Sequence, residues 1–320
     1  MAFSQIPVID LGGLRSPDLS DRKAVAAEIR HASHHVGFFY IANHGIPAEA
    51  IAATFAQTKH FFDQPLAVKN TVSITQSPIS RGYEAIRQQA LDQIPDLKEG
   101  YYIGVDRGAD DPLVQTGTPN HGANQWPTNL PGWQEPLEAY FAMMQTLACQ
   151  LMGALALSLD LDEPYFDGML DHAMSVLRLL HYPPHPVDAM TDQLGCGAHT
   201  DWGGLTILLQ DQVGGLEVCN ADGNWIKAEP IPETFVINLG DMMARWTNDY
   251  YQSTLHRVIN RSGKERYSMP FFFDLNYHAL VECLPTCQGA TNPPKYPPIT
   301  AGEHIMEMYR KTYQVTAAIA

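Results

Sequence analysis

Two histidines and one aspartate constrain the fold of this chain more than any other feature. His199 and Asp201 are two residues apart, so at the end of a β-strand their side chains would point to the same side. His256 comes much later, in the apolar and β-branched run Ser-Thr-Leu-His-Arg-Val-Ile, which predicts another strand. A sheet that folds back on itself could bring the three side chains together. Two neutral imidazoles and a carboxylate suit Fe(II) and need no cysteine.

A second polar pair follows His256 closely. Arg266 and Ser268 should share one face of a strand, because strand side chains alternate with a period of two. A planar guanidinium and a hydroxyl on one face fit a carboxylate. A single histidine or arginine is usually an ordinary core or surface residue. Their combination in this order favours a metal site with an anion site beside it.

The hydrophobic pattern predicts a mainly β protein with flanking helices. Short apolar segments follow one another from Ser175 to about Tyr277, separated by Pro, Gly and Asp, as a double-stranded β-helix (jelly roll) core requires. Earlier segments predict strands over 6–10 and 37–41 and helices over 22–36 and 48–62. Apolar residues recur every three or four positions from Trp133 to Leu155, which predicts a long amphipathic helix on the sheet.

We expect a single domain over residues 1–320. Residues 1–170 would form its N-terminal support, about 171–280 the jelly-roll core with the metal site, and 281–320 a C-terminal extension and helix. Of the residues, 45% are hydrophobic and 17% charged, enough for a substantial core. The net charge of −15 argues against a nucleic-acid partner.

Membrane insertion and disulfide bonding are not expected either. The longest apolar segment, over 147–161, is interrupted by polar residues and is too short to span a bilayer. An apolar leader is missing from the N-terminus, so we expect a cytoplasmic protein. Five cysteines, without a Cys-x-x-Cys pair, argue against a disulfide framework or a structural zinc.

Several blocks of the sequence resemble the isopenicillin N synthase-like group of Fe(II)- and 2-oxoglutarate-dependent oxygenases. The similarity extends from Ile-Pro-Val-Ile-Asp at residues 6–10 to the last helix. Its most specific blocks are His-Thr-Asp-Trp-Gly-Gly-Leu-Thr at 199–206, Asn-Asp-Tyr-Tyr-Gln-Ser-Thr-Leu-His-Arg-Val at 248–258 and Arg-Tyr-Ser at 266–268. Gly-Phe-Phe-Tyr at 37–40 and Ser-Arg-Gly-Tyr at 80–83 agree as well.

The resemblance implies a role for each matching residue. It implies that His199, Asp201 and His256 hold Fe(II), and that Arg266 and Ser268 bind the distal carboxylate of 2-oxoglutarate. Tyr182, in Leu-His-Tyr-Pro at 180–183, would assist. The family oxidises a C–H bond of a small organic molecule with O2, by hydroxylation, desaturation or cyclisation, and forms succinate and CO2. In such reactions the protein contributes positioning and exclusion of water.

The substrate site is less clearly marked. Arg81 and Tyr83 lie in a segment that, by the resemblance, borders the substrate pocket. Arg81 could bind a substrate carboxylate or phosphate, or could serve at the surface or as a helix cap. Aromatic and apolar candidates for the pocket wall, which could equally be core residues, are Tyr101, Tyr102, Trp202, Met243, Phe271 and Phe273. His121 has no ligand-like spacing and is expected at the surface.

Three other functions fit parts of this pattern. Some relatives use the arginine and serine without 2-oxoglutarate, so an Fe(II) oxidase independent of that cosubstrate is one alternative, which 2-oxoglutarate turnover would separate. A non-catalytic jelly-roll binding or sensor protein is the second, although the intact ligand set disfavours it. A zinc hydrolase could also use two histidines and a carboxylate, but neither His-Glu-x-x-His nor Gly-x-Ser-x-Gly is present.

Overall fold

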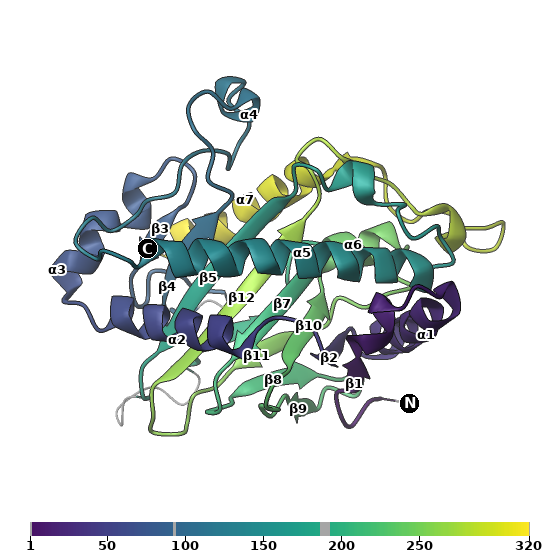
Figure 1. Ribbon diagram of the computed structural model, residues 1–320, viewed down its shortest axis with the longest axis horizontal. Coiled ribbons are helices and arrows are strands. Elements are labelled where there is room, and N and C mark those ends of the chain that lie inside the picture. The colour runs from purple at the N-terminus through teal and green to yellow at the C-terminus, as the bar shows by residue number, and fades with distance from the viewer. Residues whose placement is uncertain (1, 92–93, 186–192, 320) are drawn as a thin grey trace.

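The computed structural model, which describes residues 2–91, 94–185 and 193–319, is built around a large twisted sheet (Figure 1). Neighbouring strands of this sheet are antiparallel except for its first pair. In spatial order the strands are β1 (Val8–Asp10), β2 (Phe38–Ala42), β10 (Phe235–Leu239), β7 (Leu205–Gln210), β12 (Arg266–Asp274), β5 (Met174–Tyr182), β4 (Glu99–Gly104) and β3 (Gly82–Glu84).

A smaller antiparallel sheet faces the large one. Its strands, in order, are β6 (Cys196–His199), β11 (His256–Val258), β8 (Leu216–Cys219) and β9 (Trp225–Lys227). A buried cluster joins Phe38 and Leu180 of the large sheet to Val218 and Val258 of the small one. This is the two-sheet core that the succession of short apolar segments predicted. A further hairpin pairs β13 (Leu280–Val281) with β14 (Ile299–Thr300).

Helices cover the other face of the large sheet, and α5 runs across its strands (Figure 1). The α-helices are α1 (Leu19–His35), α2 (Ala48–Phe62), α3 (Leu66–Lys69), α4 (Pro112–Gln115), α5 (Gln134–Ser158), α6 (Asp241–Trp246) and α7 (Ala301–Ile319). Short 3₁₀ turns are Leu11–Arg15, Asn70–Val72, Ile74–Gln76, Asp167–Met169 and Pro285–Cys287. The predicted bounds of α2 are confirmed, whereas α1 begins and ends slightly earlier than predicted.

The alternation of strand side chains separates two cores. Odd-numbered residues of β5 and β12, such as Leu177 and Phe271, pack in the core that contains α5. Even-numbered residues, such as Leu180 and Tyr182 of β5, belong to the core between the sheets. The inner face of the sandwich therefore receives the even-numbered side chains of both strands, and this decides which residues can reach the site.

Helix α5 is longer than the apolar segment over 147–161 that was considered for membrane insertion. An 18-residue window within its 25 residues has a mean hydropathy of 1.4, which by length and composition alone would allow the helix to cross a membrane. Most of its apolar side chains, including Leu137, Met144 and Leu151, are buried in the core on the helix-covered face of the large sheet. Packing in this core accounts for its apolar character.

Candidate metal centre

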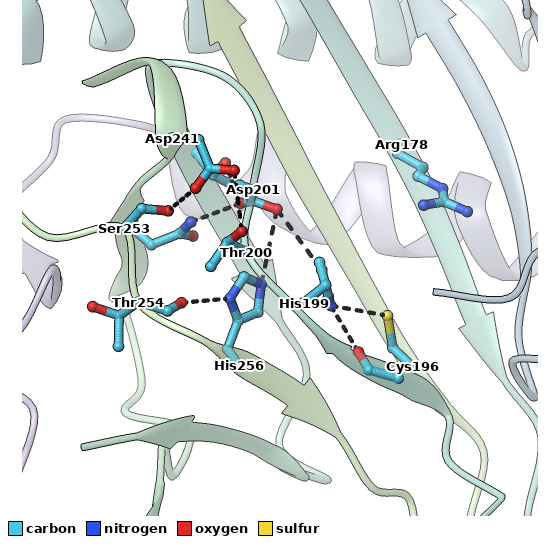
Figure 2. Close-up of polar contacts among 12 residues, drawn as sticks. Arg178, Cys196, His199, Thr200, Asp201, Asp241, Ser253, Thr254 and His256 are labelled. Carbon is cyan, nitrogen blue, oxygen red and sulfur yellow. Dashed lines mark hydrogen bonds and ion pairs between the residues drawn. The ribbon is translucent and has the colours of Figure 1, made fainter. Parts of the chain in front are cut away.

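Strand pairing brings the three predicted ligands together. β6 and β11 are antiparallel, and their register places His256 opposite His199. Asp201 follows β6 by two residues, and ligand atoms of all three side chains lie within 4.8 Å of one another. The Nε2 atoms of both histidines are 3.8 Å from Asp201 Oδ1. Figure 2 shows the three side chains pointing toward one another. The convergence expected from the spacing is therefore present.

Neighbouring groups orient each of these side chains. His199 Nδ1 is 2.8 Å from the Gly197 carbonyl oxygen, and His256 Nδ1 is 3.1 Å from that of Thr254. Each imidazole can donate its Nδ1 hydrogen there and keep Nε2 as a metal ligand. Asp201 Oδ2 accepts hydrogen bonds of 2.6 Å from Thr206 Oγ1 and Asn238 Nδ2, which leaves Oδ1 toward the histidines.

Thr206 and Asn238 were not predicted as parts of the site. Both side chains point to the inner face of the large sheet, because they occupy even-numbered positions of β7 and β10. The alternation of strand side chains is the sequence signal that could have identified them. The two hydrogen bonds hold one carboxylate oxygen and free the other. The donor set and its supports thus fit a divalent metal of the Fe(II) type.

Burial sets the protonation states of the ligands. It lowers the pKa of His199, and burial together with the neighbouring His199 lowers the pKa of His256 to about 4. Burial alone would raise the pKa of Asp201, but the two imidazoles and the hydrogen bonds from Asn238 and Thr206 lower it overall. At neutral pH the chain therefore presents two neutral imidazoles and a carboxylate, the forms that bind metal.

Arg266 and Ser268 lie side by side on β12, as predicted. Arg266 has no exposed surface, and its Nη1 donates to Ser268 Oγ at 3.0 Å while its Nε donates to the Gly214 carbonyl oxygen at 2.6 Å. Tyr182 is opposite Arg266 on β5, and its ring centre is 4.7 Å from the guanidinium carbon. Gln210, which was not predicted, accepts a long contact from Nη2 at 3.5 Å.

The described residues provide no counter-ion for Arg266. Within the described ranges, no aspartate or glutamate forms an ion pair with Arg266, and all of its acceptors are neutral. A buried cation surrounded by neutral acceptors is a site prepared for an anion.

A cavity of about 160 Å³ opens beside the metal ligands. Arg81, Tyr102 and Trp202 line it, together with His199 and Asp201. Arg178 of β5 also lines it, and Figure 2 shows its side chain across from His199. The Arg178 guanidinium is paired with Glu84 and donates to Gln89 Oε1 at 2.8 Å.

Four predicted pocket residues and Tyr83 lie elsewhere. The Tyr83 hydroxyl donates to Glu99 Oε2 at 2.6 Å, away from the cavity. Phe271 packs against Phe141 of α5, with ring centres 5.2 Å apart. The predicted residues that belong to the helix-side core instead of the cavity wall are Tyr83, Tyr101, Met243, Phe271 and Phe273.

The correction for the two phenylalanines follows from strand parity. Phe272 and Asp274 line the cavity, because they share the inner face of β12 with Arg266. His121 also differs from its expected surface position, since it is buried and lines the cavity. Its loop carries no periodic pattern from which the sequence could have placed it.

Comparisons with known proteins agree with this site. Residues 6–129 match the family model of the non-haem dioxygenase in morphine synthesis N-terminal region, and residues 173–275 match the 2OG-Fe(II) oxygenase superfamily. Across 98% of this chain and 92% of the relative, the sequence is 40% identical to the 2-oxoglutarate-Fe(II) type oxidoreductase hxnY of Emericella nidulans. The chain belongs to the 2OG-Fe(II) oxygenase superfamily.

Solved structures extend this similarity to the whole fold. A full-length Neurospora crassa protein in complex with alpha-KG has a TM-score of 0.87 and 31% identity, with 96% of both chains covered. JOX2 in complex with 2OG, Fe and JA has a TM-score of 0.78 and 30% identity, covering 94% of this chain and 84% of that one. The jelly-roll core predicted from the sequence is confirmed.

The family membership decides the general activity. The chain is a 2-oxoglutarate-dependent dioxygenase that uses Fe(II), 2-oxoglutarate and O2 to oxidise a small organic molecule. A 2-oxoglutarate-independent oxidase and a non-catalytic sensor are not favoured by these relatives.

Proposed function

We propose that His199, Asp201 and His256 hold the iron of this dioxygenase, and that residues 1–320 act as one oxygenase unit. The convergence of one atom from each side chain within 4.8 Å is the observation that carries this assignment. Three ligands on one side of a metal leave positions for the cosubstrate and O2.

In this proposal Arg266 and Ser268 bind the distal carboxylate of 2-oxoglutarate, and Tyr182 borders it. The buried guanidinium without a counter-ion supports this role, because a dicarboxylate would supply the missing negative charge. When bound, Fe(II) and 2-oxoglutarate supply the oxidising power, with succinate and CO2 as the co-products.

The residues of this chain then position the reactants and exclude water. Asn238 and Thr206 hold Asp201 in its ligand orientation. Apolar and aromatic side chains such as Phe272 and Trp202 line the cavity in which the organic substrate would meet the metal. The product, whether hydroxylated, desaturated or cyclised, depends on which C–H bond this cavity presents.

An anaerobic titration with Fe(II) and 2-oxoglutarate tests the proposal. The wild-type protein should develop the visible charge-transfer band of the chelate, and it should form succinate once O2 is admitted. Asp201→Ala should lose both signals while it remains folded by circular dichroism. Asp222→Ala, which removes an exposed carboxylate in a turn, is the matched control and should keep both.

Two results would contradict the assignment. Asp201→Ala with full iron-dependent succinate formation would exclude Asp201 as a ligand. Iron binding without the chelate band or succinate in the wild type would instead favour the oxidase that does not use 2-oxoglutarate.

A further inference from the structure

Arg81 is a buried arginine that lines the cavity, and the nearby carboxylate of Asp106 lies beyond ion-pair distance from it. Only 6% of its surface is exposed. Its Nη1 and Nη2 atoms donate to the carbonyl oxygens of Ile79 and Asn120, both at 3.1 Å, and its Nε has no partner. In the part of the chain that the structure describes, no carboxylate forms an ion pair with it. An unpaired buried cation is costly unless a ligand supplies the opposite charge.

The backbone around Arg81 is shaped to place this side chain. Ser80, directly before it, has a φ of 56°, and Gly82, directly after it, has a φ of 101°. A side chain at position 82 would overlap the Val72 carbonyl oxygen, so glycine is required there. Left-handed residues on both sides of one arginine indicate that its position is specifically maintained.

Strand β4 provides the surface on which the guanidinium rests. A Cβ atom at Gly104 would lie less than 3.0 Å from three atoms of the Arg81 guanidinium. Only the absence of a side chain at this position allows the group to lie there. Tyr102, two residues earlier on the same face of β4, also lines the cavity.

Two other basic side chains lie near Arg81. Arg107 and His121 also line the cavity. Arg107 Nη1 pairs with Asp111 at 2.7 Å, but its Nε is buried without a partner. Burial and the nearby charges of Arg107 and Arg81 lower the pKa of His121, which places the three groups close together. Since His121 is neutral at pH 7 and Arg107 is paired with Asp111, Arg81 carries the positive charge that this region offers to a ligand.

The two carboxylates that line the cavity, those of Asp201 and Asp274, lie on its side nearest the proposed metal ligands. Asp201 is a metal ligand in the proposed function, and Asp274 Oδ1 accepts a hydrogen bond of 2.7 Å from the backbone N–H of Gly204. Both lie near the turn that follows β6. Neither balances the charge of Arg81.

We propose that the organic substrate of this dioxygenase carries a carboxylate, and that Arg81 binds it. This inference rests on the proposed function for the site of oxidation, but the anion site itself rests on Arg81 and its surroundings. Nη1 and Nη2 of Arg81 each keep one N–H that is not used by Ile79 or Asn120, and these two groups can donate to the two oxygens of a planar carboxylate. A phosphate dianion has more acceptor oxygens and more charge than the free N–H groups of Arg81 would satisfy.

The cavity has room for a small acid. Its volume of about 160 Å³ is close to that of an engineered cavity that binds benzene. A carboxylic acid of about one ring with short substituents therefore fits, held by its carboxylate at Arg81 with a C–H bond near the metal ligands.

Binding of benzoate and of its neutral counterpart benzamide tests the inference. Equilibrium dialysis would use the full chain loaded with Zn(II) and 2-oxoglutarate, which cannot turn over, and also the metal-free chain. Wild-type protein should prefer benzoate by about tenfold or more, the value of a hydrogen bond to a charged group. Arg81→Gln should weaken benzoate binding about tenfold to a hundredfold and change benzamide binding less than twofold.

Control variants and the metal-free sample separate the possible causes of failure. Arg87→Gln removes the same charge from an exposed position six residues away and should leave both affinities unchanged. If the metal-free protein prefers benzoate but no iron chelate forms, the proposed function fails while the anion site stands. Should Arg81→Gln not fold, the preference of the wild type for benzoate over benzamide still decides the outcome.

Three results would overturn the proposal. The first is equal binding of benzoate and benzamide to the wild type. The second is unchanged benzoate binding in folded Arg81→Gln. The third is binding of phenyl phosphate tenfold tighter than that of benzoate, which would indicate that the substrate is a phosphate ester.

Discussion

Replacement of Arg266 by methionine should remove most of the affinity for 2-oxoglutarate without unfolding the protein. Arg266 is fully buried, and its described acceptors are the Gly214 carbonyl, Ser268 Oγ and Gln210 Oε1, all neutral. A methionine has a similar length and fills the same space. Loss of the uncompensated buried charge should offset the loss of these hydrogen bonds, so the cosubstrate-free variant should melt within a few degrees of the wild type.

The expected loss of affinity follows from the burial of the pair. Truncation of one member of a buried, hydrogen-bonded charge pair costs about 2–5 kcal/mol of binding free energy. At about 1.4 kcal/mol for each factor of ten, the dissociation constant should rise roughly 30- to 4,000-fold.

Calorimetric titration of the Zn(II)-loaded protein with 2-oxoglutarate measures this change directly. Thermal unfolding gives an independent readout, because a ligand at 100 times its dissociation constant adds about 2.7 kcal/mol to stability. For a chain of this length the wild-type melting temperature should rise by about 5 °C, and that of Arg266→Met by about 2 °C or less.

The matched control is Arg261→Met, which removes an exposed arginine just before β12. It should bind 2-oxoglutarate as the wild type does. The reasoning would be refuted by an Arg266→Met protein whose dissociation constant stays within threefold of the wild-type value. A loss of similar size in the control would refute it as well.

Three further changes test the surroundings of the site. Asn238→Ala removes a hydrogen bond to Asp201 and should weaken Co(II) binding about 10- to 100-fold. The visible absorbance of bound Co(II) measures this affinity. An unchanged titration would mean that Asn238 does not orient Asp201. Burial raises the pKa of Asp274 from 3.8 to about 7. Between these two pH values the folded state holds a proton that the unfolded state has lost. The free energy of unfolding should therefore fall as the pH rises from 3.8 to about 7. Asp274→Asn should therefore melt like the wild type near pH 4. At pH 8 the variant should be more stable than the wild type by roughly 2 kcal/mol after allowance for solvent screening. Equal melting curves at pH 8 would contradict this expectation. Gly104→Ala should displace the Arg81 guanidinium and lower benzoate affinity at least threefold with the charge still present; unchanged affinity would show that the guanidinium does not bind from this position.

Two of the proposed metal ligands and the proposed anion-binding pair could be predicted because their arrangement depends on local geometry. The period of two along a strand aligns His199 with Asp201 and Arg266 with Ser268, whatever the rest of the chain does. Similarly, the recurrence of apolar residues every three or four positions was sufficient to predict a long helix from Trp133 to Leu155, which is α5. The strand period of two also places Phe272 on the face of β12 that carries Arg266. Applied along the whole strand, it would have predicted that Phe271 and Phe273 point away from the cavity.

The sequence by itself therefore determined the candidate donor set for a metal, the candidate anion-binding pair on β12 and the class of fold, because these depend on spacing within strands and helices. Only the tertiary structure decided which residues line the cavity. Arg81, Arg107 and His121 come from the turn before β3, the segment after β4 and the loop after α4, where no periodic pattern exists. Long-range packing sets the conformation of such segments, and here that packing places them at one cavity beside the metal ligands.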